Sequence, residues 1–472
     1  MKTKAIALLM SAALLTLSAS CGNTADNPSS SDESTDTDTS IETEAVAALP
    51  DADFGGYEFI FLNGNTSYTY RSVVAEEQNG ETMNDAIYLR NTKVEDRYNI
   101  HINEVSSTSP QNDYTKSVQS GDNAFDIALL RMEWVFPVVL ENEVVNWDSI
   151  PHLNLDQDYW VQGSLTSMSL CNNIYFGVSL FDTSHFESVR TFLFNKRMIE
   201  DFKLESPYEL VNSGKWTLSK FYEMAISVGS DLDNNGSWTA NDRYGVIGYS
   251  NVLCNTLMTG VDAILSISKN ANDEPYFDLD NEYNIDRLLA VSELFKSKDG
   301  FVFTENKQDI FRNGNALFLN CLFSEVVNLR DMEDDFGIIP TPKYDENQTD
   351  YINLGGSPFF MTVPVTAPDL DRTGLIMEAL AYYSQGLVDN AYYDIVLKGK
   401  SSRDDESVEM LDLIFSTLQY YHPLANSYLN SPLADNYIWN GKTDFASYFA
   451  SVKDKINAEI DDAMNTYNEN VG

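Results

Sequence analysis

Basic residues are scarce in this sequence of 472 residues: 30 Lys and Arg stand against 72 Asp and Glu, which gives a formal charge of −42 at pH 7. A protein that tracks a phosphate backbone needs a surface rich in Lys and Arg, so no nucleic-acid partner is expected. The same balance argues against electrostatic attachment to anionic lipid. A strongly acidic surface favours a protein that stays soluble in an external medium.

Cysteine is also scarce, with 4 residues, and this number excludes a small disulfide scaffold. Cys171, Cys254 and Cys321 lie in apolar surroundings, where buried thiols are most common. One disulfide among these three is the alternative.

Long apolar runs are missing except near the start, where two lysines precede an apolar run at 5–17. This run has the length of a signal-peptide core and is shorter than a spanning helix of roughly 20 residues. Small residues then lead to Cys21, and the arrangement resembles a bacterial lipoprotein signal. We therefore predict a signal peptide at 1–20 and a lipid anchor on Cys21 at the cell surface. The alternative is an ordinary secretory signal cleaved after Ala19 or Ser20, which leaves a free chain.

The segment 21–51 is expected to be a flexible acidic tether. From residue 22 to residue 50 it holds seven Asp or Glu and ten Ser or Thr, and it has no Lys or Arg. Such a stretch cannot bury enough apolar area to offset the entropy of ordering.

From residue 57 onward, apolar runs typical of buried strands alternate with helical patterns. Strands are predicted at 57–62, 101–105, 125–130, 189–194 and 316–321. Helices are predicted at 82–97, 196–202, 218–228, 372–383 and 443–467. This alternation predicts an α/β fold in which helices cover a parallel sheet.

The sharpest local motif is the acidic loop 231–242, which has the oxygen spacing of an EF-hand calcium loop. Its candidate ligands are Asp231, Asp233, Asn235, Ser237 through its carbonyl, Thr239 and Asp242. The last position holds Asp, whose arm is shorter than that of Glu, so modest affinity is expected. We predict a structural Ca²⁺ that stiffens the loop. The alternative is an acidic surface turn without metal.

Enzyme signatures are mostly missing. The chain has neither a Gly-x-Ser-x-Gly elbow nor a His-Glu-x-x-His motif, and its 4 His are far apart in sequence. Carboxylate pairs for glycoside hydrolysis stay open, because 72 acidic residues supply many pairs. We predict no catalytic residue and no organic cofactor.

Several segments in a fixed order and spacing suggest a known family. They lie at 84–91, 94–95, 98–100, 191–197, 215–218, 311–318 and 336–342. Together they resemble the extracellular solute-binding lipoproteins of bacterial ABC importers, in particular the maltose-binding-like group. The region 159–187 matches no sugar-specific pattern of that group.

The resemblance implies a periplasmic-binding-protein-like fold, in which two α/β lobes close by hinge motion around a ligand. The first lobe is expected at 52–188 and 357–396, and the second at 189–356 and 397–472. The resemblance also implies a protein that is not an enzyme. It would capture a solute, expected to be a carbohydrate such as an oligosaccharide, and deliver it to the permease subunits of an ABC importer.

Candidate ligand-binding residues come from strand ends and crossing segments, because α/β sheets bind ligands outside the carboxyl ends of their strands. Sugars need aromatic platforms and a few polar groups. The candidates are Asn63, Tyr68, Arg131, Trp134, Phe181, Asp182, Asn320, Phe323, Ser357 and Trp439. Core packing is the alternative for the aromatic residues. Asp182 is the strongest candidate, because an acid at a lobe junction has little packing reason to be there.

Two other functions stay open: a secreted carbohydrate-active enzyme stabilised by Ca²⁺, and a surface adhesin. The missing catalytic signatures favour a binding protein over both. The pattern after Arg190, which resembles the entry to a second lobe, favours it further.

Overall fold

The computed structural model describes residues 49–64, 72–263, 267–304, 307–329, 331–397, 405–424, 428–429 and 431–471. Cys21 and Tyr68, two predicted functional residues, lie outside these ranges. All the described residues belong to one unit, Leu49–Gly472. Within them, no helix has the length and hydrophobicity needed to cross a membrane.

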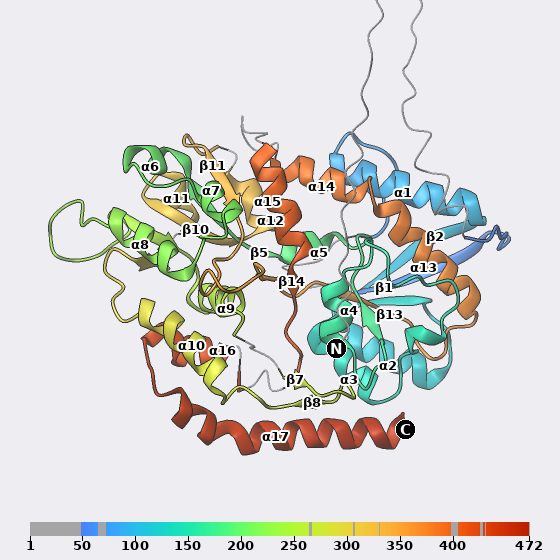
Figure 1. Ribbon diagram of the computed structural model, residues 1–472. Coiled ribbons are helices and arrows are strands. Elements are labelled where there is room, and N and C mark those ends of the chain that lie inside the picture. The colour runs from blue at the N-terminus through green and yellow to red at the C-terminus, as the bar shows by residue number, and fades with distance from the viewer. Residues whose placement is uncertain are drawn as a thin grey trace, which may run out of the picture. The chain divides into compact units, whose positions relative to one another are not determined.

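The first of two five-stranded sheets has the order β2-β1-β3-β13-β4. Figure 1 labels β1, β2 and β13 of this sheet. Its strands are β1 (Tyr57–Gly64), β2 (Ile100–Ser107), β3 (Ile127–Arg131), β4 (Phe176–Gly177) and β13 (Phe359–Thr362). β1 runs parallel to β2 and β3, whereas β13 is antiparallel to β3 and β4.

The second sheet has the order β11-β5-β10-β6-β9. Its strands are β5 (Arg190–Asn195), β6 (Tyr244–Ile247), β9 (Val302–Phe303), β10 (Ala316–Leu322) and β11 (Phe336–Ile339). β6 runs parallel to β9 and β10, whereas β5 is antiparallel to β10 and β11.

The prediction of parallel sheets is therefore wrong for β5 and β13. Each is the first strand after a passage of the chain from one sheet to the other. Arg190 at the start of β5 lies beside Leu322 at the end of β10, and Phe359 at the start of β13 lies beside Arg131 at the end of β3. A chain that enters a sheet at the edge where the parallel strands end must run in the opposite direction.

Helices surround both sheets, and small two-stranded ribbons join β7 (Ser268–Lys269) to β8 (Pro275–Tyr276) and β12 (Asn353–Leu354) to β14 (Leu418–Gln419). The helices are α1 (Thr82–Tyr98), α2 (Pro110–Ser120), α3 (Met132–Leu140), α4 (Gln162–Met168), α5 (Thr183–Ser188), α6 (Lys196–Asp201), α7 (Pro207–Asn212), α8 (Leu218–Val228), α9 (Ser250–Gly260), α10 (Glu282–Leu294), α11 (Lys307–Arg312), α12 (Phe323–Val326), α13 (Leu370–Ser384), α14 (Val388–Leu397), α15 (Asp405–Ser416), α16 (Ser431–Asn436) and α17 (Phe445–Asn470).

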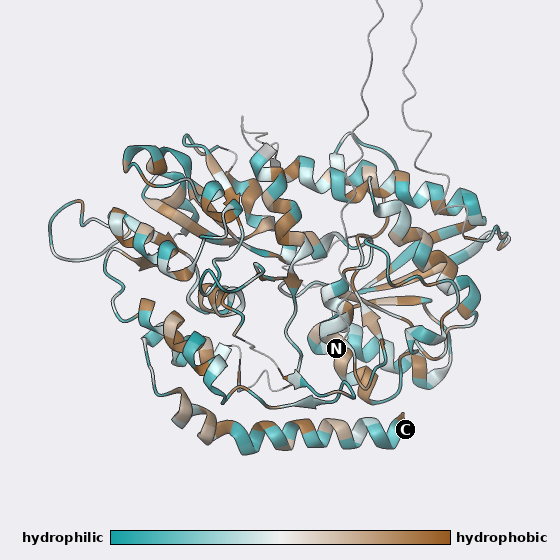
Figure 2. Ribbon diagram, viewed as in Figure 1, coloured by the Kyte–Doolittle hydropathy of each residue, from teal (hydrophilic) through white to brown (hydrophobic). Residues whose placement is uncertain are grey.

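The hydrophobic pattern of the strands explains the core on the two faces of the first sheet. In β1, Phe59 and Phe61 contribute to the cluster on one face, while Leu62 belongs to the cluster that continues into the second sheet. This alternation follows from the two-residue period of a strand. Figure 2 shows mostly hydrophobic strands and a largely polar α17, which buries only one stripe.

Two passages of the chain between the sheets press against each other. Ser188 Oγ donates a hydrogen bond to the carbonyl of Gly355 (2.8 Å). Gly356 has a φ of +68°, and a Cβ placed on it would lie 2.1 Å from the carbonyl oxygen of Ser188. Only glycine satisfies both requirements at this position.

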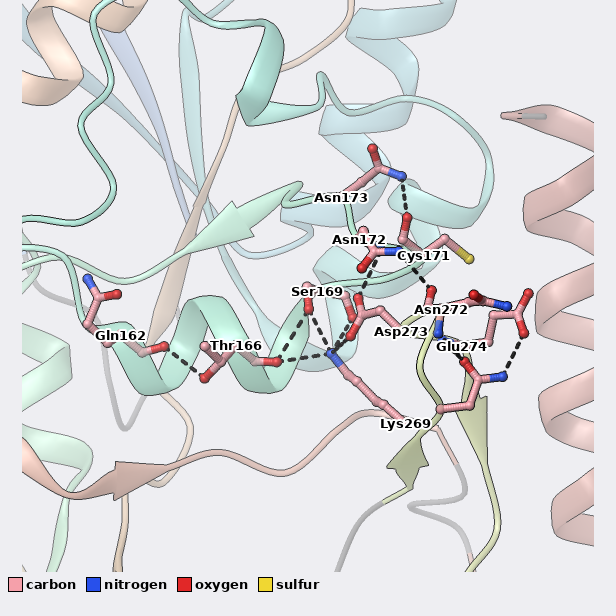
Figure 3. Close-up of polar contacts among 11 residues, drawn as sticks. Gln162, Thr166, Ser169, Cys171, Asn172, Asn173, Lys269, Asn272, Asp273 and Glu274 are labelled. Carbon is pink, nitrogen blue, oxygen red and sulfur yellow. Dashed lines mark hydrogen bonds and ion pairs between the residues drawn. The ribbon is translucent and has the colours of Figure 1, made fainter. Parts of the chain in front are cut away.

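The β7–β8 ribbon connects the second sheet's half of the molecule to α4 (Figure 3). Lys269 Nζ donates to the carbonyl of Thr166 (3.0 Å) and to Ser169 Oγ (2.9 Å) at the end of α4, and it pairs with Asp273 (3.1 Å). The backbone N–H of Asn172 in turn donates to Asp273 (3.1 Å). An ammonium group at a helix C-terminus satisfies carbonyls that have no partner within the helix. We call this set of contacts the Lys269 clamp.

The C-terminal helix α17 forms a second connection, since it contacts α10 and β8 as well as α3. At its first half, Lys453 pairs with Asp280 (2.6 Å). At its end, the hydroxyl groups of Tyr467 and Tyr175 are 2.7 Å apart, and Asn470 Nδ2 donates to the carbonyl of Leu140 (3.0 Å).

Candidate ligand site

A pocket of about 460 Å³ lies at the edges where the parallel strands of the two sheets end. It is lined by Arg131, Met132, Glu133, Arg190, Asn251, Val252, Asn255, Leu354, Gly356, Ser357, Tyr421, Pro423 and Ser431. This volume lies within the range of small-molecule sites. The residues include the end of β3, the start of β5, the helix α9 that follows β6 and the passage before β13, so both sheets contribute to one pocket.

Arg131 forms the side of the pocket nearest to the first sheet. It ends β3, and the chain turns directly into α3, whose first residues Met132 and Glu133 also line the pocket. Arg131 Nε lies 2.9 Å from a carboxylate oxygen of Glu133, and a terminal nitrogen donates to Ser357 Oγ at 3.4 Å. The guanidinium group also lies 6.0 Å from the ring centre of Trp134.

Arg190 enters the pocket from the second sheet. Its backbone pairs with Leu322, but its guanidinium makes no hydrogen bond or ion pair with any described residue. Burial lowers the pKa of Arg190, since surrounding protein removes part of its hydration. The five N–H donors of this side chain therefore have no acceptor among the described residues.

The remaining polar groups come from α9 and from the segment after β14. Asn251 and Asn255 lie on the first two turns of α9 and face the pocket. The hydroxyl of Tyr421 donates to the carbonyl of Asn255 (3.2 Å) and lies 3.0 Å from Thr259 Oγ1. Burial raises the pKa of Tyr421, so this hydroxyl stays protonated near neutral pH.

No protein-family model matches the sequence, and the comparison with curated proteins finds no relative. Solved structures do match over most of the chain. The GacH receptor of Streptomyces glaucescens is 13% identical, and the match covers 86% of this chain and 99% of the receptor with a TM-score of 0.53. The ABC substrate-binding protein Lmo0181 from Listeria monocytogenes is also 13% identical, with coverage of 86% and 99% and a TM-score of 0.52. UgpB from Mycobacterium tuberculosis is 15% identical, with coverage of 87% and 99% and a TM-score of 0.50.

The chain has the fold of the ABC solute-binding proteins. The predicted fold class, two α/β lobes of the maltose-binding-like kind, is confirmed. We use first lobe for the part that carries the first sheet and second lobe for the part that carries the second sheet. The lobe boundaries at 188, 356 and 396 stay predictions.

Of the predicted ligand-binding residues, the structure brings two into the pocket, Arg131 and Ser357. Trp134 does not line the pocket, but its ring centre lies 6.0 Å from the guanidinium of Arg131 and 6.4 Å from the ring centre of Phe359. Tyr68 lies outside the described residues. None of the other six lines this pocket.

Asp182 does not line the pocket, and it has a structural reason to lie at this junction. It is the N-cap of α5, where one oxygen accepts from the backbone N–H of Ser184 (2.9 Å) and the other accepts from Ser184 Oγ. Ser184 Oγ also accepts from the backbone N–H of Phe359 (2.9 Å), so the cap connects α5 to the start of β13. The sequence Asp-Thr-Ser before a short helix is a capping signal.

Three predicted aromatic residues pack within the core or against it. Phe181 is 1% exposed and stacks on Phe61, with ring centres 5.2 Å apart. Phe323 is fully buried and stacks on Phe415. Trp439 packs against Phe295. The core-packing alternative is the better description of all three.

Two predicted asparagines are fully buried in the sheets. Asn63 in β1 donates to Glu104 (3.0 Å). Asn320 in β10 donates to the carbonyl of Thr191 (3.1 Å) and faces α9 through Thr256. Both therefore act within their own lobes.

Several pocket residues are not predicted from the sequence: Glu133, Arg190, Asn251, Asn255 and Tyr421. Asn251 follows the end of β6, a strand that the sequence pattern does not predict. Because ligands bind outside the carboxyl ends of strands, a prediction of β6 would also have pointed to Asn251. Arg190 lies at the start of a predicted strand. Because ligand-binding residues are expected at the carboxyl ends of strands, this position does not point to Arg190. No local pattern in the sequence singles out Tyr421.

The acidic loop 231–242 brings three of its predicted ligands together. Carboxylate oxygens of Asp231, Asp233 and Asp242 lie within 4.8 Å of one another. The backbone N–H of Gly236 donates to Asp231 Oδ2 (2.8 Å) and lowers the pKa of this carboxyl, while Asp231 Oδ1 has no hydrogen-bond partner among the described residues. Asn235, Ser237 and Thr239 lie in the same loop; Asn235 Oδ1 accepts from the backbone N–H of Ser237 (2.7 Å), and Thr239 Oγ1 donates to Asp242 (3.2 Å).

Cys171, Cys254 and Cys321 are free thiols, in agreement with the expectation of thiols and not with the alternative of one disulfide. Cys254 and Cys321 are buried, and Cys171 is partly exposed. No disulfide joins them.

The burial of Asp182 can be tested through its effect on the pH dependence of stability. Burial raises its pKa from 3.8 to about 6, so the folded protein holds the proton more tightly than the unfolded chain. The stability that Asp182 contributes should therefore be fully present below pH 4 and decrease as the pH rises to about 6, by about 3 kcal/mol. The measurement is urea unfolding of wild type and Asp182→Asn from pH 4 to pH 7. A difference between the two proteins that stays constant over this range would contradict the prediction.

Proposed function

We propose that this protein captures a carbohydrate in the pocket between its lobes and delivers it to an ABC importer. The observation that carries the proposal is the position of the pocket, whose polar lining comes from the strand ends of both lobes. The neighbours with the same fold support it. The GacH receptor was solved unliganded and in complex with acarbose, Lmo0181 with cycloalternan and UgpB with glycerophosphocholine. Permease subunits in the membrane are the partners that this role requires.

The lining of the pocket favours binding over hydrolysis. A glycosidase needs two carboxyl groups on opposite sides of the scissile bond. Among the described residues that line the pocket, Glu133 is the sole carboxylate, and Arg131 holds it at 2.9 Å. A single paired carboxylate does not provide both the acid and the base, so we propose a protein that is not an enzyme.

A substitution that fills the pocket tests its role. Val252 lines the pocket from the first turn of α9, and a Trp at this position would occupy space needed by a ligand. The ligand is first selected by thermal shift with acarbose, cycloalternan, glycerophosphocholine and a panel of neutral and acidic oligosaccharides, since binding to the folded state raises the melting temperature. Val252→Trp should weaken its binding about tenfold or more in calorimetric titration.

The control for this test is Ile226→Trp, which adds the same bulk on the exposed face of α8, where Ile226 is 47% exposed. It should bind like wild type. Equal affinity of Val252→Trp and wild type would place the ligand elsewhere.

We propose that a lipid on Cys21 anchors the protein on the outer side of the membrane. The support is the short apolar run, the small residues before Cys21 and the acidic tether after it. Cys21→Ala should move the protein from the membrane fraction to the medium, as shown by fractionation and immunoblotting. Cys171→Ala is the control and should stay with the membrane. Retention of Cys21→Ala in the membrane fraction would contradict the anchor.

We also propose that the 231–242 loop binds one structural Ca²⁺. Three carboxylates within 4.8 Å repel one another unless a cation lies between them, and Asp231 Oδ1 offers an oxygen without a partner. Ca²⁺ at 100 times its dissociation constant should stabilise the fold by about 2.7 kcal/mol, so EDTA should lower the melting temperature by a few degrees.

The control for the calcium test is a substitution of Asp345, a residue whose local hydrogen bonds resemble those of Asp231. Asp231→Ala should abolish the effect of EDTA. Asp345→Ala should retain it, because Asp345 also accepts backbone N–H groups in an acidic turn but belongs to no cluster of three such ligands among the described residues. A wild-type melting curve that EDTA leaves unchanged would favour the metal-free turn.

A further inference from the structure

The pocket is positively charged in a protein that is otherwise strongly acidic. Its described lining holds two guanidinium groups, Arg131 and Arg190, and one carboxylate, Glu133. The whole chain has 72 acidic and 30 basic residues. Two of the few basic residues therefore lie at the site where a ligand would be held.

Arg190 is the group that most needs an acceptor. Its guanidinium is partly buried and makes no hydrogen bond or ion pair with a described residue. Glu325 acts on it electrostatically, but the carboxylate oxygens of Glu325 accept from the backbone N–H of Leu322 (2.9 Å) and from Gln308 (3.2 Å). A desolvated cation without a hydrogen-bond acceptor is costly, and an anionic ligand group removes that cost.

Two helices begin at the same pocket. The first turns of α3 and of α9 line it. Arg131, the N-cap residue of α3, makes no side-chain capping bond, whereas in α9 the backbone N–H of Val252 donates to Asn251 Oδ1 (2.8 Å). The first N–H groups of a helix have no partner within the helix, and the helix dipole places positive charge there. Both features favour the binding of an oxyanion, as does the positive charge of Arg190.

The pocket offers little surface for stacking. Tyr421 is the one aromatic residue in its described lining, and its hydroxyl already bonds the carbonyl of Asn255. Neutral oligosaccharides depend on aromatic platforms for much of their affinity. Charge is therefore the larger source of selectivity here.

We propose that the solute is a carbohydrate that carries an oxyanion, and that Arg190 and the first turns of α3 and α9 bind this group. The proposal rests on the proposed function and names the class of its ligand. Carboxylate, sulfate and phosphate share the required chemistry, since each offers two oxygens to the fork of an arginine.

The experiment compares acidic and neutral forms of one sugar. Wild type, Arg190→Gln and Arg190→Lys are titrated with trigalacturonate and its methyl ester, and then with a sulfated disaccharide and glucose 1-phosphate to identify the oxyanion. Wild type should prefer one acidic sugar. Arg190→Gln should weaken its binding by about 10- to 100-fold, with a smaller loss for Arg190→Lys, which keeps the charge. Lys116→Gln, which removes one charge from an exposed side chain on α2, should bind like wild type.

The other possible outcomes distinguish a failure of this inference from a failure of the proposed function. Equal binding of the ester and the acid, unaffected by Arg190→Gln, would overturn the oxyanion and leave carbohydrate binding intact. Inorganic sulfate tests the oxyanion site without a sugar. If sulfate raises the melting temperature of wild type but not that of Arg190→Gln, the result would support the oxyanion site. If sulfate has this effect and no carbohydrate binds, the proposed function would be overturned. No response to carbohydrate or sulfate would overturn both. Circular dichroism of each variant verifies that it is folded.

Discussion

The backbone contact between Ser188 and Gly356 is the constraint on which the pocket depends. A Cβ on Gly356 would lie 2.1 Å from the carbonyl oxygen of Ser188, so the two passages between the lobes approach as closely as backbone allows. Arg190 follows Ser188 by two residues, and Ser357 follows Gly356 directly. The contact therefore places the starts of β5 and β13 at one point, and both of these residues line the pocket. A side chain at Gly356 would separate the passages and, with them, the two sides of the site.

The connections between the lobes limit how the pocket can change shape. The Lys269 clamp and α17 also join the two lobes, and none of their residues lines this pocket. A hinge motion of the two lobes would therefore have to pivot about these contacts as well as about Gly356. The clamp is polar and partly buried, so its hydrogen bonds fix orientation more than they contribute net stability. Polar contacts can be exchanged during a hinge motion at a smaller cost than a packed apolar interface.

Local patterns predicted five strands and five helices near their observed places, but they did not predict strands such as β4, β6 and β13 or the direction of β5. Helix α8 has the predicted bounds, and the other predicted strands and helices agree to within a few residues, because apolar periodicity and capping residues are local signals. The reversed direction of β5 and β13 depends on which sheet edge the chain enters, and no residue in the strand encodes that. The same reason explains the site. Arg131 and Ser357 were found from strand ends and crossings, whereas Arg190 becomes a pocket residue only because β5 starts where β10 ends. Asp182 is the opposite case, because its role is signalled locally: an Asp directly before a short helix caps that helix.

The acidic surface and the basic pocket act over different distances. At physiological ionic strength, charges beyond about 8 Å are largely screened, so the formal charge of −42 affects solubility and the rate of approach more than the bound state. Within the pocket, protein replaces water around Arg190, and interactions at hydrogen-bond distance are much stronger than in bulk solvent. An anionic solute would therefore approach against a weak, screened repulsion and then be held by close contacts. This separation allows a highly acidic protein to bind an anion, provided that its arginines are few, partly buried and placed where both lobes meet.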